Sequence, residues 1–210
     1  MQPYQTIRQT AAAPAVASVA EKKSEFIAAA AHVQTEEEAV AFLEQVRARH
    51  RTARHNVYAY LLRADGRTRY SDDGEPAKTA GLPVLEVLQH AGLTDVACVV
   101  TRYFGGILLG TGGLVRAYTQ AAQAALAAAA VVTVTPCVRM TVRLAYPLYE
   151  RACLLVEASG ARTENTEYGA DVTLQLLMPD GLQAALSAQL TELSRGQARI
   201  AVSEAFYTAF

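Results

Sequence analysis

Five glycines stand between residues 105 and 113, directly after a run of β-branched residues and directly before an apolar helical pattern. Glycine lets a backbone approach a ligand closely, and the amide groups at a helix start attract an anion. Arg102, Tyr103 and Arg116 flank the segment, and their side chains are of the types that bind phosphate or stack on a base. We therefore predict an anion or nucleic-acid site at this connection, formed mainly by Gly105, Gly106, Gly112 and Gly113.

The glycine pattern differs from the known nucleotide-binding motifs. No Gly-Lys-Ser/Thr sequence follows the glycines, and Val115 stands where the last glycine of a G-x-G-x-x-G motif would be. The segment is therefore neither a P-loop nor a Rossmann fingerprint. The structural alternative is that the glycines only permit tight turns and close packing of the helix on the sheet.

A second unusual segment holds three carboxylates within four residues, Asp72, Asp73 and Glu75, together with a glycine and a proline. The length and the final Glu of an EF-hand loop are missing, and no HExxH partner accompanies the acids. Asp side chains also close Asx-turns, which glycine and proline favour. We interpret the segment as a rigid acidic turn without a metal ion, which forms one surface with His55 and Thr79.

The strongest local charge is a run of four arginines with no acid between them: Arg47, Arg49, Arg51 and Arg54. The formal net charge is only −1, so the whole chain offers no general field that attracts nucleic acid. Arginine suits bidentate phosphate contacts, but it is also the basic residue that a GC-rich genome favours. The four arginines therefore either contact phosphates or only reflect the composition of the genome, and both explanations remain open.

No residue pattern marks a catalytic centre. Only His55 among the four histidines lies beside a candidate segment, and no Ser or Cys stands in a nucleophile elbow. Cys98, Cys137 and Cys153 are far apart and have apolar neighbours, which is typical of buried thiols. The sequence therefore predicts neither a catalytic residue nor a cofactor.

The first half of the chain contains the elements that must position these segments. Two apolar runs predict a β-hairpin, and Thr35 with Glu38 forms a capping box at the start of a helix that ends in the arginine run. A second hairpin, a helix, a doubly buried strand and a last helix follow. The hairpins are expected within 16–33 and 57–70, the strand at 96–101, and the later helices at 82–92 and 114–130.

The second half follows a different order, strand, helix, two strands, helix and strand. The expected ranges are 138–145, 147–158, 161–166, 172–178, 181–193 and 198–202. This βαββαβ order is the ferredoxin-like pattern. We therefore predict an α+β protein of two domains, residues 1–135 and 136–210, with the boundary near Thr135–Pro136.

The composition, 51% hydrophobic and 19% charged residues, suits a folded protein with a sizeable core. No run of eighteen apolar residues is free of polar interruption, and residues 1–13 lack the apolar core of a signal peptide. We expect a cytoplasmic protein that does not bind membranes, whereas the oligomeric state is not predicted.

Four segments read together resemble the bacterial form of the IMPACT family: residues 22–28, 55–60, 71–83 and 100–118. Several long motifs in one order make the match specific, and Tyr146, the region of Tyr168 and residues 194–196 extend it over nearly the whole chain. Two positions depart from the family pattern. Lys78 stands where glycine is usual, and Glu25 replaces a commonly basic residue of the first hairpin.

The resemblance implies a ribosomal-protein-like βαβ first domain, similar to domain IV of translocation elongation factors. It also implies a second domain like the ferredoxin-like C-terminal module of those factors. Eukaryotic members carry an additional N-terminal partner-binding domain and restrain a translation-control kinase. We expect that this chain lacks that domain, so their role is not carried over intact.

Three functions follow as hypotheses. The first is a non-enzymatic regulator of translation that associates with RNA or the ribosome through the arginine run, Arg102, Arg116 and Tyr103. The second is a protein-protein regulator that docks the acidic turn and Tyr103-Phe104 on a partner without nucleic acid. The third is an enzyme or binder for a small anionic ligand, with His55 or Asp73 as the base.

Overall fold

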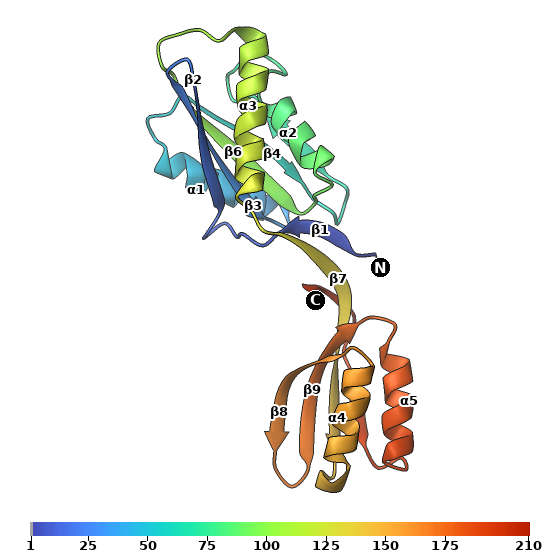
Figure 1. Ribbon diagram of the computed structural model, residues 1–210. Coiled ribbons are helices and arrows are strands. Elements are labelled where there is room, and N and C mark those ends of the chain that lie inside the picture. The colour runs from blue at the N-terminus through green and yellow to red at the C-terminus, as the bar shows by residue number, and fades with distance from the viewer. Residues whose placement is uncertain (1) are drawn as a thin grey trace. The chain divides into compact units, whose positions relative to one another are not determined.

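The computed structural model describes residues 2–210, so Met1, the first residue of the predicted N-terminal domain, lies outside the described residues. The chain divides into two compact units, Tyr4–Val132 and Thr133–Phe210, the second of which also includes residues 2 and 3. Each unit combines helices with antiparallel strands (Figure 1), so the architecture is α+β as predicted. Within residues 2–210, no helix has both the length and the apolar character needed to span a membrane.

A five-stranded antiparallel sheet forms the centre of the first unit, in the order β2-β3-β6-β4-β5. Its strands are β2 (Ala15–Glu21), β3 (Ser24–His32), β6 (Val96–Tyr103), β4 (His55–Leu61) and β5 (Thr68–Ser71). The hairpin predicted from the two apolar runs is β2–β3. Its turn holds Lys22 and Lys23 at positive φ, 44° and 65°. A short strand near the N-terminus, β1 (Tyr4–Ile7), was not expected from the sequence.

Helices cover both faces of this sheet (Figure 1). The β-branched strand β6 shows why, because successive side chains of a strand point to opposite faces. Val96, Cys98 and Val100 pack with α2 (Gly81–His90) and α3 (Gly110–Ala127). Ala97 and Val99 pack with α1 (Glu36–Arg49). The strand is therefore buried on both faces, as its composition predicted.

The N-terminus of α1 is fixed by side-chain hydrogen bonds. The Thr35 hydroxyl accepts a bond from the Glu38 amide at 3.2 Å, and the Glu38 carboxylate accepts one from the Gln34 amide at 2.7 Å. The helix buries Phe42 completely against the sheet. Its last turn contains Arg47 and Arg49, where positive charge complements the helix dipole. The predicted capping residues thus start the helix that ends in the arginine run.

The helix after the glycine segment starts earlier than predicted. It begins at Gly110 rather than Leu114, so Gly112 and Gly113 lie in its first turn and the connecting loop is shorter than the glycine pattern indicated. Glycine is a poor helix former, but the burial of Leu114 and of the residues after it outweighs that preference. Gly110 itself has a φ of 71°, which a residue with a side chain adopts only with strain.

The second unit has an antiparallel sheet in which β7, β9 and β8 lie in that order, while β10 and β11 pair with β7. Helices α4 and α5 cover one face (Figure 1). The strands are β7 (Val131–Leu144), β8 (Arg162–Tyr168), β9 (Val172–Pro179), β10 (Arg199–Val202) and β11 (Phe206–Ala209). The helices are η1 (Tyr146–Leu148), α4 (Tyr149–Ala158) and α5 (Gln183–Leu193).

The element order of this unit is the βαββαβ order expected from the sequence. Strand β11 was not predicted from the sequence, and it pairs with the first part of β7. The position proposed for the domain boundary, Thr135–Pro136, lies inside β7 rather than in a loop.

Candidate functional site

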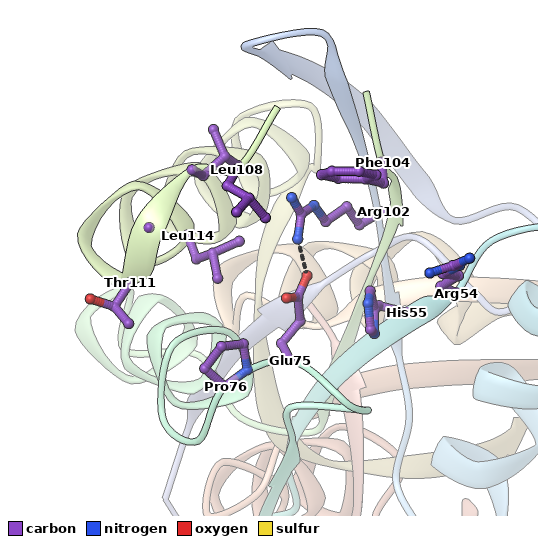
Figure 2. Close-up of a pocket in the computed structure, with 11 residues that line it drawn as sticks. Arg54, His55, Glu75, Pro76, Arg102, Phe104, Leu108, Thr111 and Leu114 are labelled. Carbon is purple, nitrogen blue, oxygen red and sulfur yellow. Dashed lines mark hydrogen bonds and ion pairs between the residues drawn. The ribbon is translucent and has the colours of Figure 1, made fainter. Parts of the chain in front are cut away.

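The acidic turn, residues 71–81, and the loop that leads into α3 meet around a cavity of about 450 Å³ in the first unit. Figure 2 shows the side chains that line it, with an ion pair at the centre and apolar side chains beside it. The lining residues are Arg54, His55, Glu75, Pro76, Arg102, Phe104, Leu108, Leu109, Gly110, Thr111 and Leu114.

Asp72 holds the acidic turn against the start of α2. Its carboxylate accepts hydrogen bonds from the amides of Lys78 at 2.8 Å, Ala80 at 3.0 Å and Gly81 at 2.8 Å. A helix start leaves such amides without intrahelical acceptors, and a carboxylate there is favourable. Thr79 is buried and its hydroxyl donates to the Pro76 carbonyl oxygen at 2.7 Å. Asp72 and Thr79 therefore stabilise the turn itself.

Asp73 ties the turn to β4 and α1. Its carboxylate accepts a bond from the Asn56 amide at 2.6 Å and one from the Arg47 guanidinium at 3.2 Å. The Asp73 carbonyl oxygen lies 2.8 Å from Nδ1 of His55. A carbonyl can only accept, so Nδ1 carries the proton and Nε2 of a neutral His55 ring is left as an acceptor. Among residues 2–210, no three His, Cys, Asp or Glu side chains are grouped to hold a metal ion.

The third carboxylate, Glu75, forms a buried ion pair with Arg102. One oxygen of Glu75, Oε1, accepts bonds from Nη1 of Arg102 at 2.6 Å and from the Tyr118 hydroxyl at 2.8 Å. The two charged side chains are only 5% and 7% exposed. Burial, together with the charge of Glu75, raises the pKa of Tyr118, so its hydroxyl stays protonated as a donor.

The buried position of Arg102 differs from the expectation that it would be an exposed guanidinium beside the glycine loop. Arg102 follows Val96, Cys98 and Val100 on the face of β6 that α3 covers, so the alternation of the strand turns it inward. Its guanidinium lies 5.4 Å from the Phe26 ring and 5.5 Å from the Phe104 ring. The Nε atom is buried and has no hydrogen-bond partner within residues 2–210.

The glycines selected from the sequence differ in their surroundings. A Cβ at Gly105 would lie 1.9 Å from the Lys23 carbonyl oxygen, and the Gly105 amide donates to the Ser24 hydroxyl at 3.1 Å. Gly105 therefore serves the packing of the loop on the hairpin turn, and its amide is not available to an anion. Gly113 is buried, and its Cβ would lie 3.1 Å from the Leu109 side chain.

Two other glycines are exposed. Gly106 has a φ of 85° and a Cβ there would meet open space. Gly112 lies in the first turn of α3, and the Arg116 guanidinium is the nearest group, 3.6 Å from where its Cβ would be. Arg116 is itself exposed, so the start of α3 has a cation beside it.

The arginine run is mostly exposed. Arg49, Arg51 and Arg54 are exposed, whereas Arg47 is partly buried between Glu44 and Asp73. Arg54 is also part of the cavity wall (Figure 2). The last arginine of the run therefore lies at the cavity.

The exposed aromatic side chain of this surface is Phe104, which the sequence placed in a protein-docking surface but not among the nucleic-acid-binding residues. Tyr103 is half-buried and its hydroxyl lies 3.0 Å from Nδ1 of His50, whereas Phe104 is 51% exposed. Leu108, 83% exposed, and the buried Tyr118 were given no role from the sequence. A signal did exist, because Phe104 and Leu108 are large apolar residues in a loop that lacks any helical or strand period.

Comparison with known proteins gives matches in both units. The Impact N-terminal domain family matches residues 22–126, and a domain of unknown function (DUF1949) matches residues 142–197. The IMPACT family member YigZ of Escherichia coli is 39% identical over 92% of this chain and 96% of that protein. YvyE of Bacillus subtilis, of the same family, is 35% identical over 89% of this chain and 86% of its own length.

A solved structure, described as the crystal structure of a hypothetical protein, covers 95% of this chain and 97% of that one at 37% identity, with a TM-score of 0.64. A eukaryotic relative, the Protein IMPACT homolog of Saccharomyces cerevisiae, matches only 44% of this chain at 35% identity. The bacterial relatives thus match nearly the whole chain, including the turn and the loop around the cavity. On this evidence the chain belongs to the IMPACT family.

Proposed function

We propose that this IMPACT family member is an RNA- or ribosome-associated regulatory protein linked to translation control, and that it acts without enzymatic chemistry. One observation carries the proposal. Arg54 belongs both to the exposed arginine run and to the wall of a cavity that also contains the exposed Phe104 ring and the start of α3. Arginines that contact phosphates beside an aromatic ring that stacks on a base are the usual components of a single-stranded RNA surface.

The two domains support the same proposal. In residues 136–210 the strand order β10-β7-β9-β8, with helices after the first and third strands, supports a ferredoxin-like fold. For residues 1–135 we propose the ribosomal-protein-like fold of elongation-factor domain IV. Fold analogy alone does not establish a function, so the weight of the argument stays on the arginine run and the cavity.

The test is the binding of a fluorescein-labelled single-stranded RNA 12-mer to the full chain, measured by anisotropy over a salt series. We expect affinity to fall steeply with salt, because each phosphate contact adds about 0.7 to the logarithmic slope for a single strand. The Arg51→Ala/Arg54→Ala variant then has a slope smaller by about 1.4. No binding at low salt, or a slope that is flat, contradicts the proposal.

The matched control is Arg67→Ala/Arg69→Ala, which removes the same charge from exposed positions near and on β5. These arginines pair with acids, mainly Glu36, and lie outside the cavity lining. We expect this variant to keep the salt slope of the unmodified protein. An equal loss of slope in both variants means that the protein attracts RNA only through its total charge.

A protein-protein regulator is the second candidate, favoured by the exposed apolar side chains of the loop before α3. Phe104, Ile107 and Leu108 are 51%, 42% and 83% exposed. Exposed apolar groups that gather in one place mark interaction surfaces. Capture of a partner that survives nuclease treatment, and that is lost in Leu108→Ser, supports this candidate over RNA. The small anionic ligand is the third candidate, since His55 and Gly110 line one cavity.

A further inference from the structure

The floor of the cavity offers one hydrogen-bond acceptor beside one donor. Oε1 of Glu75 takes both bonds that the carboxylate receives, from Arg102 and Tyr118, which leaves Oε2 without a partner in the described chain. Nη2 of Arg102 likewise has none among the described residues, since only Nη1 is bonded. Neither atom is among the fully buried unpaired atoms, so both keep accessible surface. Figure 2 shows the two atoms on the side of the ion pair that faces Leu108 and Leu114.

The start of α3 adds a site for negative charge. The first amides of a helix have no acceptor within the helix, and in the described chain no side chain caps α3. Gly110 and Thr111 line the cavity, and the Arg116 guanidinium lies beside the same turn. The nearly buried side chains of Arg102 and Glu75, 7% and 5% exposed, keep Nη2 and Oε2 without a partner among the described residues, which is an independent indication that a ligand belongs in the cavity.

The remaining walls are apolar and partly aromatic. Phe104, Leu108 and Leu114 surround the charged floor, and about 450 Å³ lies within the range of ligand pockets. A bare phosphate would leave these walls unfilled and the oxygen of Glu75 unpaired. A ligand with a flat ring, ring-edge donors and acceptors, and an attached phosphate satisfies all the groups together.

We propose that the cavity binds one nucleotide of single-stranded RNA and selects a base with an exocyclic amino group. The amino group donates to Oε2 of Glu75, Nη2 of Arg102 donates to the neighbouring ring acceptor, the ring stacks on Phe104, and the phosphate lies at the start of α3. Carboxylates accept from the cytosine amino group in known protein-nucleic acid contacts. The inference rests on the proposed function and adds that the bound RNA is read at one base.

Cytidine and uridine 5′-monophosphates are matched probes, because uracil has a carbonyl oxygen where cytosine has its amino group. We expect the cytidine nucleotide to bind the full chain about tenfold more tightly, as is usual for one well-placed base contact. Backbone amide NMR titration measures both affinities and shows whether Thr111 responds. Ribose 5-phosphate and inorganic phosphate are the control ligands. Equal affinity for the two nucleotides, or for cytidine monophosphate and ribose 5-phosphate, overturns the inference.

A variant tests the phosphate position without disturbing the fold. Thr111→Asp places a carboxylate in the first turn of α3, which stabilises the helix but repels a phosphate. Gln120→Asp adds the same charge at an exposed position further along α3, outside the cavity lining. We expect Thr111→Asp to weaken cytidine monophosphate binding at least fivefold with no fall in melting temperature, and Gln120→Asp to change neither. Equal binding by both variants contradicts the proposed phosphate position.

The failure of this inference is distinguishable from the failure of the proposed function. If the RNA 12-mer binds with a steep salt dependence and cytidine and uridine monophosphates bind alike, the arginine run binds RNA and the base selection is wrong. If cytidine monophosphate binds selectively and the 12-mer does not bind, the cavity is a small-ligand site and the RNA function is wrong.

Discussion

The acidic turn at residues 71–81 and the segment Phe104–Gly112 look equally unusual in the sequence. The chain satisfies the polar groups of the turn with its own hydrogen bonds, whereas it leaves groups of the other segment exposed. In the turn, Asp72 and Asp73 accept bonds from backbone amides and from Arg47, so the chain itself satisfies them. In the other segment, an aromatic ring and Leu108 are exposed, and α3 begins without a side-chain cap among the described residues. An unusual composition therefore marks a rigid support in one case and an open site in the other.

Glu75 is the point at which the two segments meet. It belongs to the turn by sequence, yet it pairs with Arg102 and Tyr118, and it lines the cavity. The rest of the turn holds this carboxylate in place, because Asp73 binds a backbone amide of β4 and Asp72 binds backbone amides at the start of α2. One segment thus positions a charge, whereas the other leaves exposed the groups that we propose bind the ligand. Substitutions of Asp72 or Asp73 should therefore lower stability, whereas substitutions of the exposed groups in Phe104–Gly112 should lower binding.

The largest effect on stability is expected at the one glycine of the loop that is enclosed by backbone. Gly105→Ala places a Cβ 1.9 Å from the Lys23 carbonyl oxygen, so we expect the free energy of unfolding to fall by about 3 kcal/mol. Gly112→Ala is the matched control, because it adds the same methyl group in an exposed helical turn and should be neutral or stabilise slightly. Urea denaturation measures both. Equal effects would mean that the hairpin turn moves to admit the methyl group.

A somewhat smaller effect is expected in the acidic turn. Asp72→Ala removes the acceptor of three backbone amides at the start of α2, which should cost about 2 kcal/mol of unfolding free energy. Asp65→Ala is the control, since Asp65 is exposed in the β4–β5 turn. Salt-dependent binding of the RNA 12-mer should be unchanged in the folded Asp72→Ala protein. Loss of RNA binding at full folding would assign the turn a direct contact.

The smallest of these effects on stability is expected at Tyr118, which links α3 to the turn. Tyr118→Phe removes one hydrogen bond to a charged acceptor and should cost about 1.5 kcal/mol near neutral pH. The pKa of Tyr118 is raised in the folded state above its ordinary value of 10.0. Its contribution is therefore complete below about pH 10 and is lost as pH rises towards the folded pKa. Unfolding measured from pH 8 to 11 should show a flatter alkaline decline in the variant, and parallel curves would contradict this role.

Much of the fold could be predicted because it depends on local patterns. The first hairpin, the Thr35 cap and the doubly buried β6 follow from alternation and capping chemistry, which neighbouring residues determine. The start of α3 could not be predicted, because the burial of Leu114 and the following residues overrides the low helix propensity of Gly112 and Gly113. Strand β11 could not be predicted either, because its pairing with β7 joins residues that lie far apart in the sequence.

The contacts around the cavity could be predicted only in part, for a physical reason that differs from residue to residue. Alternation along β6 would have placed Arg102 inside, but its pairing with Glu75 joins two distant segments and no local pattern encodes it. Gly105 and Gly106 are indistinguishable in the sequence, and only the Lys23 carbonyl oxygen separates a packing glycine from an exposed one. Residue type thus selected the two segments that meet around the cavity, whereas tertiary contacts decide which of their groups remain accessible.

The most direct test of this account is a backbone amide NMR map of the full chain during titration with the single-stranded RNA 12-mer. We predict that the resonances of Phe104, Gly110, Thr111 and Gly112 shift progressively, together with those around Arg51 and Arg54. The amides of Lys78, Ala80 and Gly81 should stay in place, because Asp72 already holds them. Shifts confined to the acidic turn, or to residues outside both segments, would contradict the claim that the start of α3 and the cavity beside it form the binding site.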